Sequence, residues 1–266
     1  MFSLFRTNKL SSTESVDIIE KIVYEYLKPL GFRKHGRTLH RFVEGDISQV
    51  VHLQNGCPQK GVYGILWVNL GIRVPECMER TFNPSQPLKK YYHEYECNIH
   101  TTLGMLADNR DTSYNLKKDP QKIGTDIVAR LRKFALPVFD QLNSRQAILT
   151  YRKDHPNFDQ ITSHMIPLED AMIYGRWGDL DQATQKFHQY YQKVLAEYEH
   201  DLEHGSKEYL RKGETVTYYN ARTSCTETIT ASKSGYVTLY DASDRHLIYL
   251  AELAKELGLS LPPSRL

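Results

Sequence analysis

The fold is decided by the stretch from Phe32 to Val74. It reads FRKHGRTLHRFV over residues 32–43, EGD over 44–46, ISQVVHLQ over 47–54 and, after a loop, VYGILWVNLGIRV over 62–74. The three long runs are rich in β-branched and aromatic residues, which is typical of strands. The connection at 44–46 is far shorter than the dozen or so residues that a parallel crossover needs. The first two strands are therefore predicted to form an antiparallel hairpin.

The third run is predicted to be a central strand. Its even positions from Leu66 to Val74 are uniformly apolar, whereas its odd positions begin apolar and end with Asn69 and Arg73. A strand that is apolar on both faces for part of its length is usually covered on both sides. A fourth strand is predicted where apolar residues alternate with polar ones, at Tyr95, Cys97 and Ile99.

Amphipathic helices flank these strands. Ser11 and Glu14 have the spacing of a capping box ahead of an apolar stripe, so residues 11–30 are predicted to form a helix. Asp119 followed by Pro120 starts another helix, and two short helices extend to residue 153. The prediction is an α+β fold: a mostly antiparallel sheet of four or five strands with packed helices, followed by a helical C-terminal region.

A linker is predicted at residues 154–157, where Pro156 disfavours helical backbone at the residue before it. This divides the chain into an α+β domain over residues 1–155 and a helical C-terminal region over residues 156–266. The long helix of that region has more apolar surface than its short partner can cover. We therefore expect the region to dock on the first domain.

Within the C-terminal region, the apolar pattern predicts a short helix from Pro167 and a long helix that ends at Gly205. A further short helix is predicted over residues 206–212, and a last helix over 243–257. Residues 214–241 carry only β-type fragments, and their structure stays open.

The order of short motifs resembles a known family. A helix that ends in LKPLGFRK is followed by LHRF, LQNG and VNLGI, and further on by ECNIH and LGML. Over about residues 16–150 this combination resembles the uncharacterised bacterial family called domain of unknown function 4304. The resemblance implies a fold and a domain extent but no activity. The family pattern has arginines where this chain has Thr101 and Thr102, so no function is carried over at those positions.

A second resemblance lies in the C-terminal region. The pattern of Tyr174, Gly178 and Ala183 to Phe187 is similar to one tetratricopeptide helix pair. Such repeats need about three copies to bury their faces, and the sequence has one. We interpret it as a single helical hairpin.

Composition indicates an ordinary globular protein. Of the 266 residues, 40% are hydrophobic and 25% charged, and the net charge of +2 does not point to a polyanionic partner. No apolar run approaches the roughly 20 residues that span a bilayer, and the N-terminus does not look like a signal peptide. Four scattered cysteines suit reduced thiols. We expect a cytoplasmic protein with no membrane partner, and we assign it no cofactor.

Strand parity places polar and aromatic side chains on the face of the sheet opposite the core. If Ile47, Val51 and Leu53 face the core, the opposite face carries His52, Gln54, Trp67, Asn69 and Arg73, joined from the fourth strand by Glu96, Asn98 and His100. An aromatic ring among hydrogen-bonding groups of both charges is how a binding surface is built. The alternative is a face that is solvated or covered by a helix.

Two stretches contain residue types of metal sites. His200, Glu203 and His204 match an HxxEH motif, in which both histidines share a helix face and the glutamate serves as the base of a metal-dependent hydrolase. The motif lies in the last helical turn, where the helix dipole favours cationic side chains anyway. The second stretch holds His93, Cys97 and His100. On a strand these side chains would lie on both faces, so they could not converge on one ion.

The densest basic run includes Arg33, Lys34, Arg37 and Arg41. Such a strand can contact phosphates, but charges also protect an edge strand from aggregation. The near-neutral net charge favours the second interpretation. We do not expect nucleic acid as the main partner.

The sequence therefore favours a non-enzymatic binding protein that recognises a protein or a small ligand on the mixed sheet face. One alternative is a metal-dependent hydrolase that uses His200, Glu203 and His204. A second is weak nucleic-acid binding through the Arg33–Arg41 run. The sequence has no nucleophile elbow, phosphate-binding loop or dinucleotide fingerprint, and it leaves open whether there is any catalysis.

Overall fold

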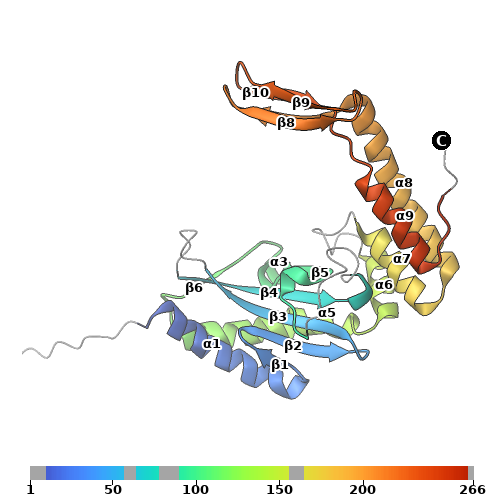
Figure 1. Ribbon diagram of the computed structural model, residues 1–266. Helices are drawn as coiled ribbons and strands as arrows, with labels where there is room; N and C mark the ends of the chain where they lie inside the picture. The colour runs from blue at the N-terminus through green and yellow to red at the C-terminus, as the bar shows by residue number, and fades with distance from the viewer. Residues whose placement is uncertain (1–9, 57–63, 78–89, 156–164, 263–266) are drawn as a thin grey trace, which may run out of the picture. The chain divides into compact units, whose positions relative to one another are not determined.

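The computed structural model describes residues 10–56, 64–77, 90–155 and 165–262. The chain forms two compact units, residues 1–164 and 165–266 (Figure 1). Within the described residues, no helix has the length and apolar character needed to cross a membrane.

The first unit is built on an antiparallel sheet with strand order β1-β2-β3-β4-β5, and β6 pairs with the far end of β4. The strands are β1 (Arg33–His35), β2 (Thr38–Val43), β3 (Ile47–Asn55), β4 (Ile65–Arg73), β5 (Ile99–Thr102) and β6 (Tyr114–Asn115). The predicted hairpin is confirmed: Val43 pairs with Ile47 around a turn in which Glu44 and Gly45 have positive φ. β4 is central, as predicted, because β3 and β5 flank it.

Helices cover one face of this sheet (Figure 1). They are α1 (Ser12–Leu27), α4 (Pro120–Arg130), α5 (Leu136–Gln141) and α6 (Arg145–Asp154), with the short α3 (Leu103–Asp108) after β5. α1 starts with the predicted capping box of Ser11 and Glu14. α1 packs on β3 and closely on α4, where a side chain at Gly124 would overlap Ile22. The α+β prediction is therefore correct.

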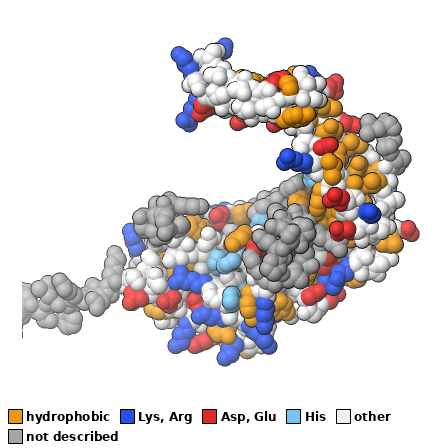
Figure 2. All heavy atoms as spheres, in the orientation of Figure 1, with side chains coloured by type: hydrophobic (Ala, Val, Ile, Leu, Met, Phe, Trp, Pro, Cys, Tyr) orange, Lys and Arg blue, Asp and Glu red, His pale blue; other side chains and the backbone are white. Residues whose placement is uncertain are grey.

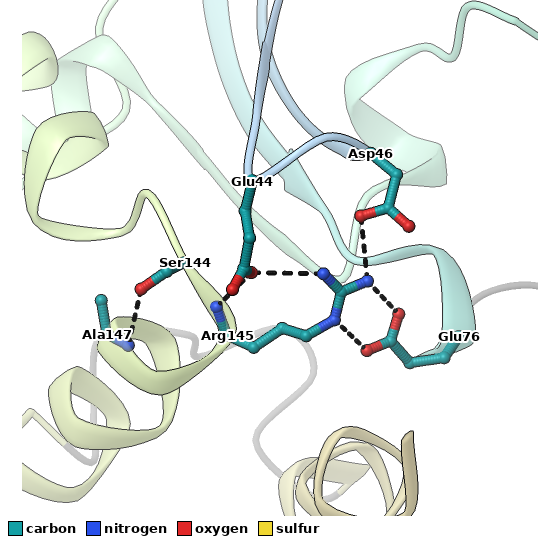
Figure 3. Close-up of polar contacts among 6 residues, drawn as sticks. All are labelled: Glu44, Asp46, Glu76, Ser144, Arg145 and Ala147. Carbon is teal, nitrogen blue, oxygen red and sulfur yellow. Dashed lines mark hydrogen bonds and ion pairs between the residues drawn. The ribbon is translucent and has the colours of Figure 1, made fainter. Parts of the chain in front are cut away.

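A buried arginine joins three parts of the first unit (Figure 3). The Arg145 guanidinium, at the start of α6, makes two bonds to Glu76, at 2.6 and 2.8 Å, just beyond β4. It also contacts Asp46 at 3.0 Å and Glu44 at 3.2 Å in the β2–β3 turn. The hydrogen bonds to Glu76 raise the pKa of Arg145 above its usual range. This contact set holds α6 against the hairpin.

The predicted fourth strand is wrong in its first half. Glu94–Glu96 forms a 3-10 helix, η3, and only Ile99–Thr102 pairs with β4. The side chain of Glu94 turns inward onto the sheet, so the segment crosses the sheet face instead of extending it. Cys97 then packs on Gly71 of β4, where a Cβ atom would lie 2.7 Å from the cysteine sulfur. The missing side chain of Gly71 makes this crossing possible.

The second unit begins with α7 (Ile166–Trp177) and α8 (Leu180–His204). A third helix, α9 (Arg245–Leu257), follows the strands of this unit. α7 and α8 form the predicted hairpin, with Gly178 in the left-handed region and Asp179 capping α8. α8 packs against both α7 and α9. Its residues Phe187 and Tyr190 are buried.

The predicted helix over residues 206–212 is wrong. The chain forms β7 (Ser206–Leu210), β8 (Thr215–Asn220), β9 (Cys225–Thr230) and β10 (Gly235–Leu239) instead, so the residues left open by the sequence are a β-ribbon. β7 pairs with β10 and β8 with β9 in one continuous register. β7 is a strand because it pairs with β10, some 30 residues further along the chain. Such non-local pairing overrides the local helix preference.

The ribbon folds back on itself. Its tip lies beside its base, since the Ala221 amide donates to the Tyr240 carbonyl at 2.7 Å. Arg222, also at the tip, bonds to the Leu202 and Glu203 carbonyls at the end of α8 and stacks on the Tyr240 ring. These carbonyls have no partner inside the helix, so Arg222 acts as a cap for α8.

Candidate functional site

The sheet face opposite the helices carries the predicted polar set. In the β3–β4 register, His52 lies opposite Asn69 and Gln54 opposite Trp67, and Arg73 lies at the far end of the same face. Strand parity therefore predicts correctly that these five residues share a face. The face is not simply solvated, however. Asn69 and Arg73 are buried, because the chain segment around η3 crosses over them.

Glu94 is the centre of the polar contacts on this face. Its carboxylate lies 2.5 Å from His52 Nδ1 and accepts a hydrogen bond from Asn69 Nδ2 at 2.8 Å. Asn69 also donates to Gln54 Oε1 at 2.6 Å. Burial alone would raise the pKa of Glu94, but the contacts with His52 and Asn69 outweigh it and lower the pKa. Glu94 is therefore a carboxylate that two strands hold in place.

The remaining predicted residues have other roles. Asn98 is buried and accepts a hydrogen bond from the Val74 amide at 2.8 Å, which fixes the end of β4. Glu96 caps η3 by accepting from the His93 amide at 2.8 Å. His100 is on β5 opposite Gly71, and its Nδ1 lies 3.2 Å from the Cys97 carbonyl. The structure thus brings His52 and Asn69, and Gln54 through Asn69, together at Glu94.

A cavity of about 200 Å³ opens beside Glu94 on the same face. It is lined by two strands and by the residues before η3: His35, Thr38, His40, Tyr91, Tyr92, His93 and Glu96. The ring of Tyr91 stacks on His35, with centroids 4.5 Å apart, and packs on His40 at 5.1 Å. Histidine side chains gather on the surface of this unit in Figure 2.

His40 is the most deeply buried residue of this cavity. Only 1% of it is exposed. Its Nδ1 lies 3.4 Å from Ser48 Oγ, while its Nε2 is buried and has no hydrogen-bond partner among the described residues. Burial, and next to it the neighbouring His35, His93 and His52, lower the pKa of His40 to about 4. His40 is therefore neutral at pH 7 and offers one unused polar atom.

One group among the described residues has the donors for a metal ion. His52, His93 and Glu94 each offer a ligand atom, and these atoms lie within 4.8 Å of one another. The imidazole rings of His52 and His93 are 5.2 Å apart, and His93 stacks on Tyr95.

In the described part of the chain, neither of the two metal motifs predicted from the sequence brings three ligand atoms together. His200 and His204 stack on one another at 4.7 Å on the exposed surface of α8. Asp201 and Glu203 lie beside them, but no three ligand atoms of the described residues converge there. The earlier combination of His93 with Cys97 and His100 does not form a group either. Burial raises the pKa of the Cys97 thiol far above neutrality, which disfavours metal binding by this residue.

Three cations of the basic run pair with acids of their own unit, on α1 and α5: Lys34 with Glu20, Arg37 with Asp17 and Arg41 with Asp140. β1 is an edge strand, which supports the interpretation of these charges as protection against edge-to-edge pairing.

A larger cavity of about 560 Å³ lies where α1 and α4 begin, between Ser11, Lys117 and Asp119. Helix N-termini attract anions, but Ser11 and Asp119 already accept hydrogen bonds from first-turn amides. Glu14 adds a carboxylate beside Ser11. These caps satisfy donors that an anion would need.

Sequence reasoning missed His40 and Glu94 for two different reasons. His40 was predictable: the 44–46 turn sets the hairpin register, which places His40 on the same face as His52. Glu94 was not predictable, because strand parity at residues 94–100 places it on a strand, whereas the structure turns it onto the sheet from η3.

No curated protein and no solved structure shows significant similarity to the chain. Residues 23–141 match the family model described as domain of unknown function (DUF4304). This match covers the whole sheet, α4 and α5, and therefore also Glu94 and the histidine-lined cavity. The candidate site of the first unit thus lies within the residues that are similar to this family.

Proposed function

We propose that the protein is a non-enzymatic binding protein that takes a small planar ligand into the cavity lined by His35, His40 and Tyr91. The observation that carries this proposal is the unpartnered Nε2 of buried His40 at that cavity. A buried polar atom without a partner is costly unless water or a ligand satisfies it. Nε2 is closed to solvent in this structure, so a ligand that hydrogen-bonds to it must shift a side chain of the cavity wall, and the bond then offsets the cost.

The shape of the cavity supports a small planar ligand. Its volume of about 200 Å³ is below the range of roughly 300–1,000 Å³ that is usual for drug-sized molecules. Its walls are aromatic or imidazole rings, of which His35 and Tyr91 lie nearly parallel, 16° apart. Flat rings favour stacking with a flat ligand, and Thr38 adds a hydroxyl at the wall.

The one described cysteine close to the cavity segment is not an activated nucleophile. Cys97 lies on the same side of the sheet, but burial keeps its thiol protonated at neutral pH by raising its pKa. A thiol in that state is a poor nucleophile. This favours binding over covalent catalysis.

The test uses adenine, benzoate and imidazole as probes, titrated into the full-length protein with chelator present and followed by calorimetry. We expect at least one probe to bind, and His35→Ala to weaken it at least tenfold, because His35 is exposed and its loss leaves the core intact. Thr38→Val should weaken the same probe. Tyr236→Ala, on the exposed ribbon of the second unit, is the control. Equal binding by wild type and His35→Ala, or no binding of any probe at 10 mM (roughly 2.7 kcal/mol at most), contradicts the proposal.

A further inference from the structure

The neighbouring group of His52, His93 and Glu94 has the composition of a transition-metal site. Two imidazoles and one carboxylate are a frequent protein ligand set for Zn²⁺, and they leave a fourth position open. The three ligand atoms already lie within 4.8 Å of one another. They come from different elements: His52 from β3, and His93 and Glu94 from the segment that crosses the sheet.

The spacing requires a small closure. Ligand atoms around one tetrahedral zinc ion are about 3.4 Å apart at bond lengths near 2.0–2.1 Å. His93 and its neighbours must therefore approach by up to about 1.4 Å. His93 is exposed, so an ion reaches it from solvent, and its ring must shift against Tyr95, on which it stacks. His52 Nδ1 and the Glu94 carboxylate, now 2.5 Å apart, must separate by a similar amount.

Hydrogen bonds hold the Glu94 carboxylate in one orientation, as is usual for a residue that ligates a metal. Asn69 holds the other oxygen of Glu94 at 2.8 Å, and Gln54 in turn holds Asn69. Metal-ligating carboxylates are usually held by such outer hydrogen bonds, whose loss weakens metal affinity. The ion pair between His52 and Glu94 uses one carboxylate oxygen, and Asn69 separately fixes the other.

We propose that His52, His93 and Glu94 bind a divalent transition-metal ion of the zinc class. His93 also lines the histidine-lined cavity, so the metal site adjoins this cavity. The inference goes beyond the proposed function and does not depend on it, because zinc binding is measured without any organic ligand.

The experiment uses tag-free, full-length protein that has been stripped with chelator and dialysed, with Zn²⁺ alone as the probe. A competing chromophoric chelator gives the affinity and elemental analysis gives the stoichiometry. We expect one zinc per chain. His93→Ala and Glu94→Gln should each weaken binding at least tenfold, with thermal unfolding showing that both variants fold. Co²⁺ in place of Zn²⁺ should give the visible absorption of a tetrahedral site.

The matched control is the double variant His200→Ala, His204→Ala, which removes the other close histidine pair and should bind zinc as wild type does. The proposal is overturned if wild type holds less than about a fifth of an equivalent of zinc, if His93→Ala retains wild-type affinity, or if the control variant loses the metal. His35→Ala separates the two proposals, because it should lose the organic probe and keep the zinc.

Discussion

At the scale of single residues, Arg145 is the side chain whose replacement we expect to destabilise the fold strongly. Its guanidinium is only 6% exposed and contacts three carboxylates, of which Glu76 is 10% exposed. Removing one partner of a buried charge group leaves the others desolvated and unpaired. The bidentate contact with Glu76 needs the planar fork of arginine, so lysine is not an equivalent replacement.

We predict that Arg145→Ala lowers the free energy of unfolding by about 3 kcal/mol, the low end of the range for buried pairs because Glu44 and Asp46 are partly exposed. Urea denaturation measures it. Arg37→Ala is the control: Arg37 meets only exposed Asp17 at 3.3 Å, and its loss should cost less than about 1 kcal/mol. Similar losses for both variants would show that the Arg145 contacts are not stabilising.

His40 makes a separate prediction about pH. Its pKa falls from the ordinary value of 6.5 to about 4 on folding, because the ring is buried beside His35, His52 and His93. Between these two values the unfolded chain binds a proton that the folded chain does not. The stability contribution is therefore present in full above pH 6.5 and is lost as the pH falls toward 4, by on the order of 3 kcal/mol.

Urea denaturation between pH 4.5 and 7.5, with chelator present, tests this directly. Wild type should lose stability more steeply than His40→Gln as the pH falls. The glutamine variant keeps a polar group at the site but does not titrate in this range. Parallel curves for the two proteins would mean that His40 is solvated in the folded state.

At the scale of elements, the success of sequence reasoning depended on how local the deciding contact is. The β2–β3 hairpin was predictable because a three-residue connection fixes both direction and register. The start of α4 was predictable because Asp119 caps the helix and Pro120 occupies its first position, so the signal is local. β7 was not, since Ser206–Leu210 is a strand only through its pairing with Gly235–Leu239.

The candidate site follows the same rule. Residues on paired strands, such as His52 and Asn69, were placed on one face by parity alone. Glu94 reaches that face through η3, and His93 through the same crossing segment, which depends on the space above Gly71. Only the fold reveals that these residues meet His52.

The folded-back ribbon of the second unit gives a prediction at this scale. Arg222 ties the ribbon tip to the end of α8 through two carbonyls and the Tyr240 ring. We expect Arg222→Ala to release the tip, because a two-stranded ribbon is marginally stable without packing. Hydrogen exchange should show faster exchange of the β8 and β9 amides by roughly tenfold, the equivalent of about 1.4 kcal/mol.

The matched control is Lys233→Ala, an exposed residue near the other end of β9, which should leave β8 and β9 exchange unchanged. The exchange of α4 in the first unit serves as an internal reference. Unchanged β8 exchange in Arg222→Ala would show that the strand pairing holds the ribbon by itself.

At the scale of the whole molecule, the two units differ in what supports them. The first has a sheet and helices around residues such as Val51, Leu70 and Ile127, all buried. In the second, α9 packs on α8, supplying cover that the sequence pattern did not assign to it. The expectation that the C-terminal region must dock on the first domain rested on apolar surface of α8 left without a partner. α9 provides one.

We therefore predict that the two units fold independently. Residues 1–164 and 165–266, produced as separate chains, should each be soluble and unfold cooperatively, because a unit with its own core is able to fold alone. Calorimetry should show the 1–164 fragment melting within a few degrees of the corresponding transition in the intact chain, a difference below about 1 kcal/mol. Aggregation of this fragment, or a melting temperature lower by 10 °C or more, would instead favour the docking expected from the sequence, since burial of several aromatic side chains contributes on the order of a few kcal/mol.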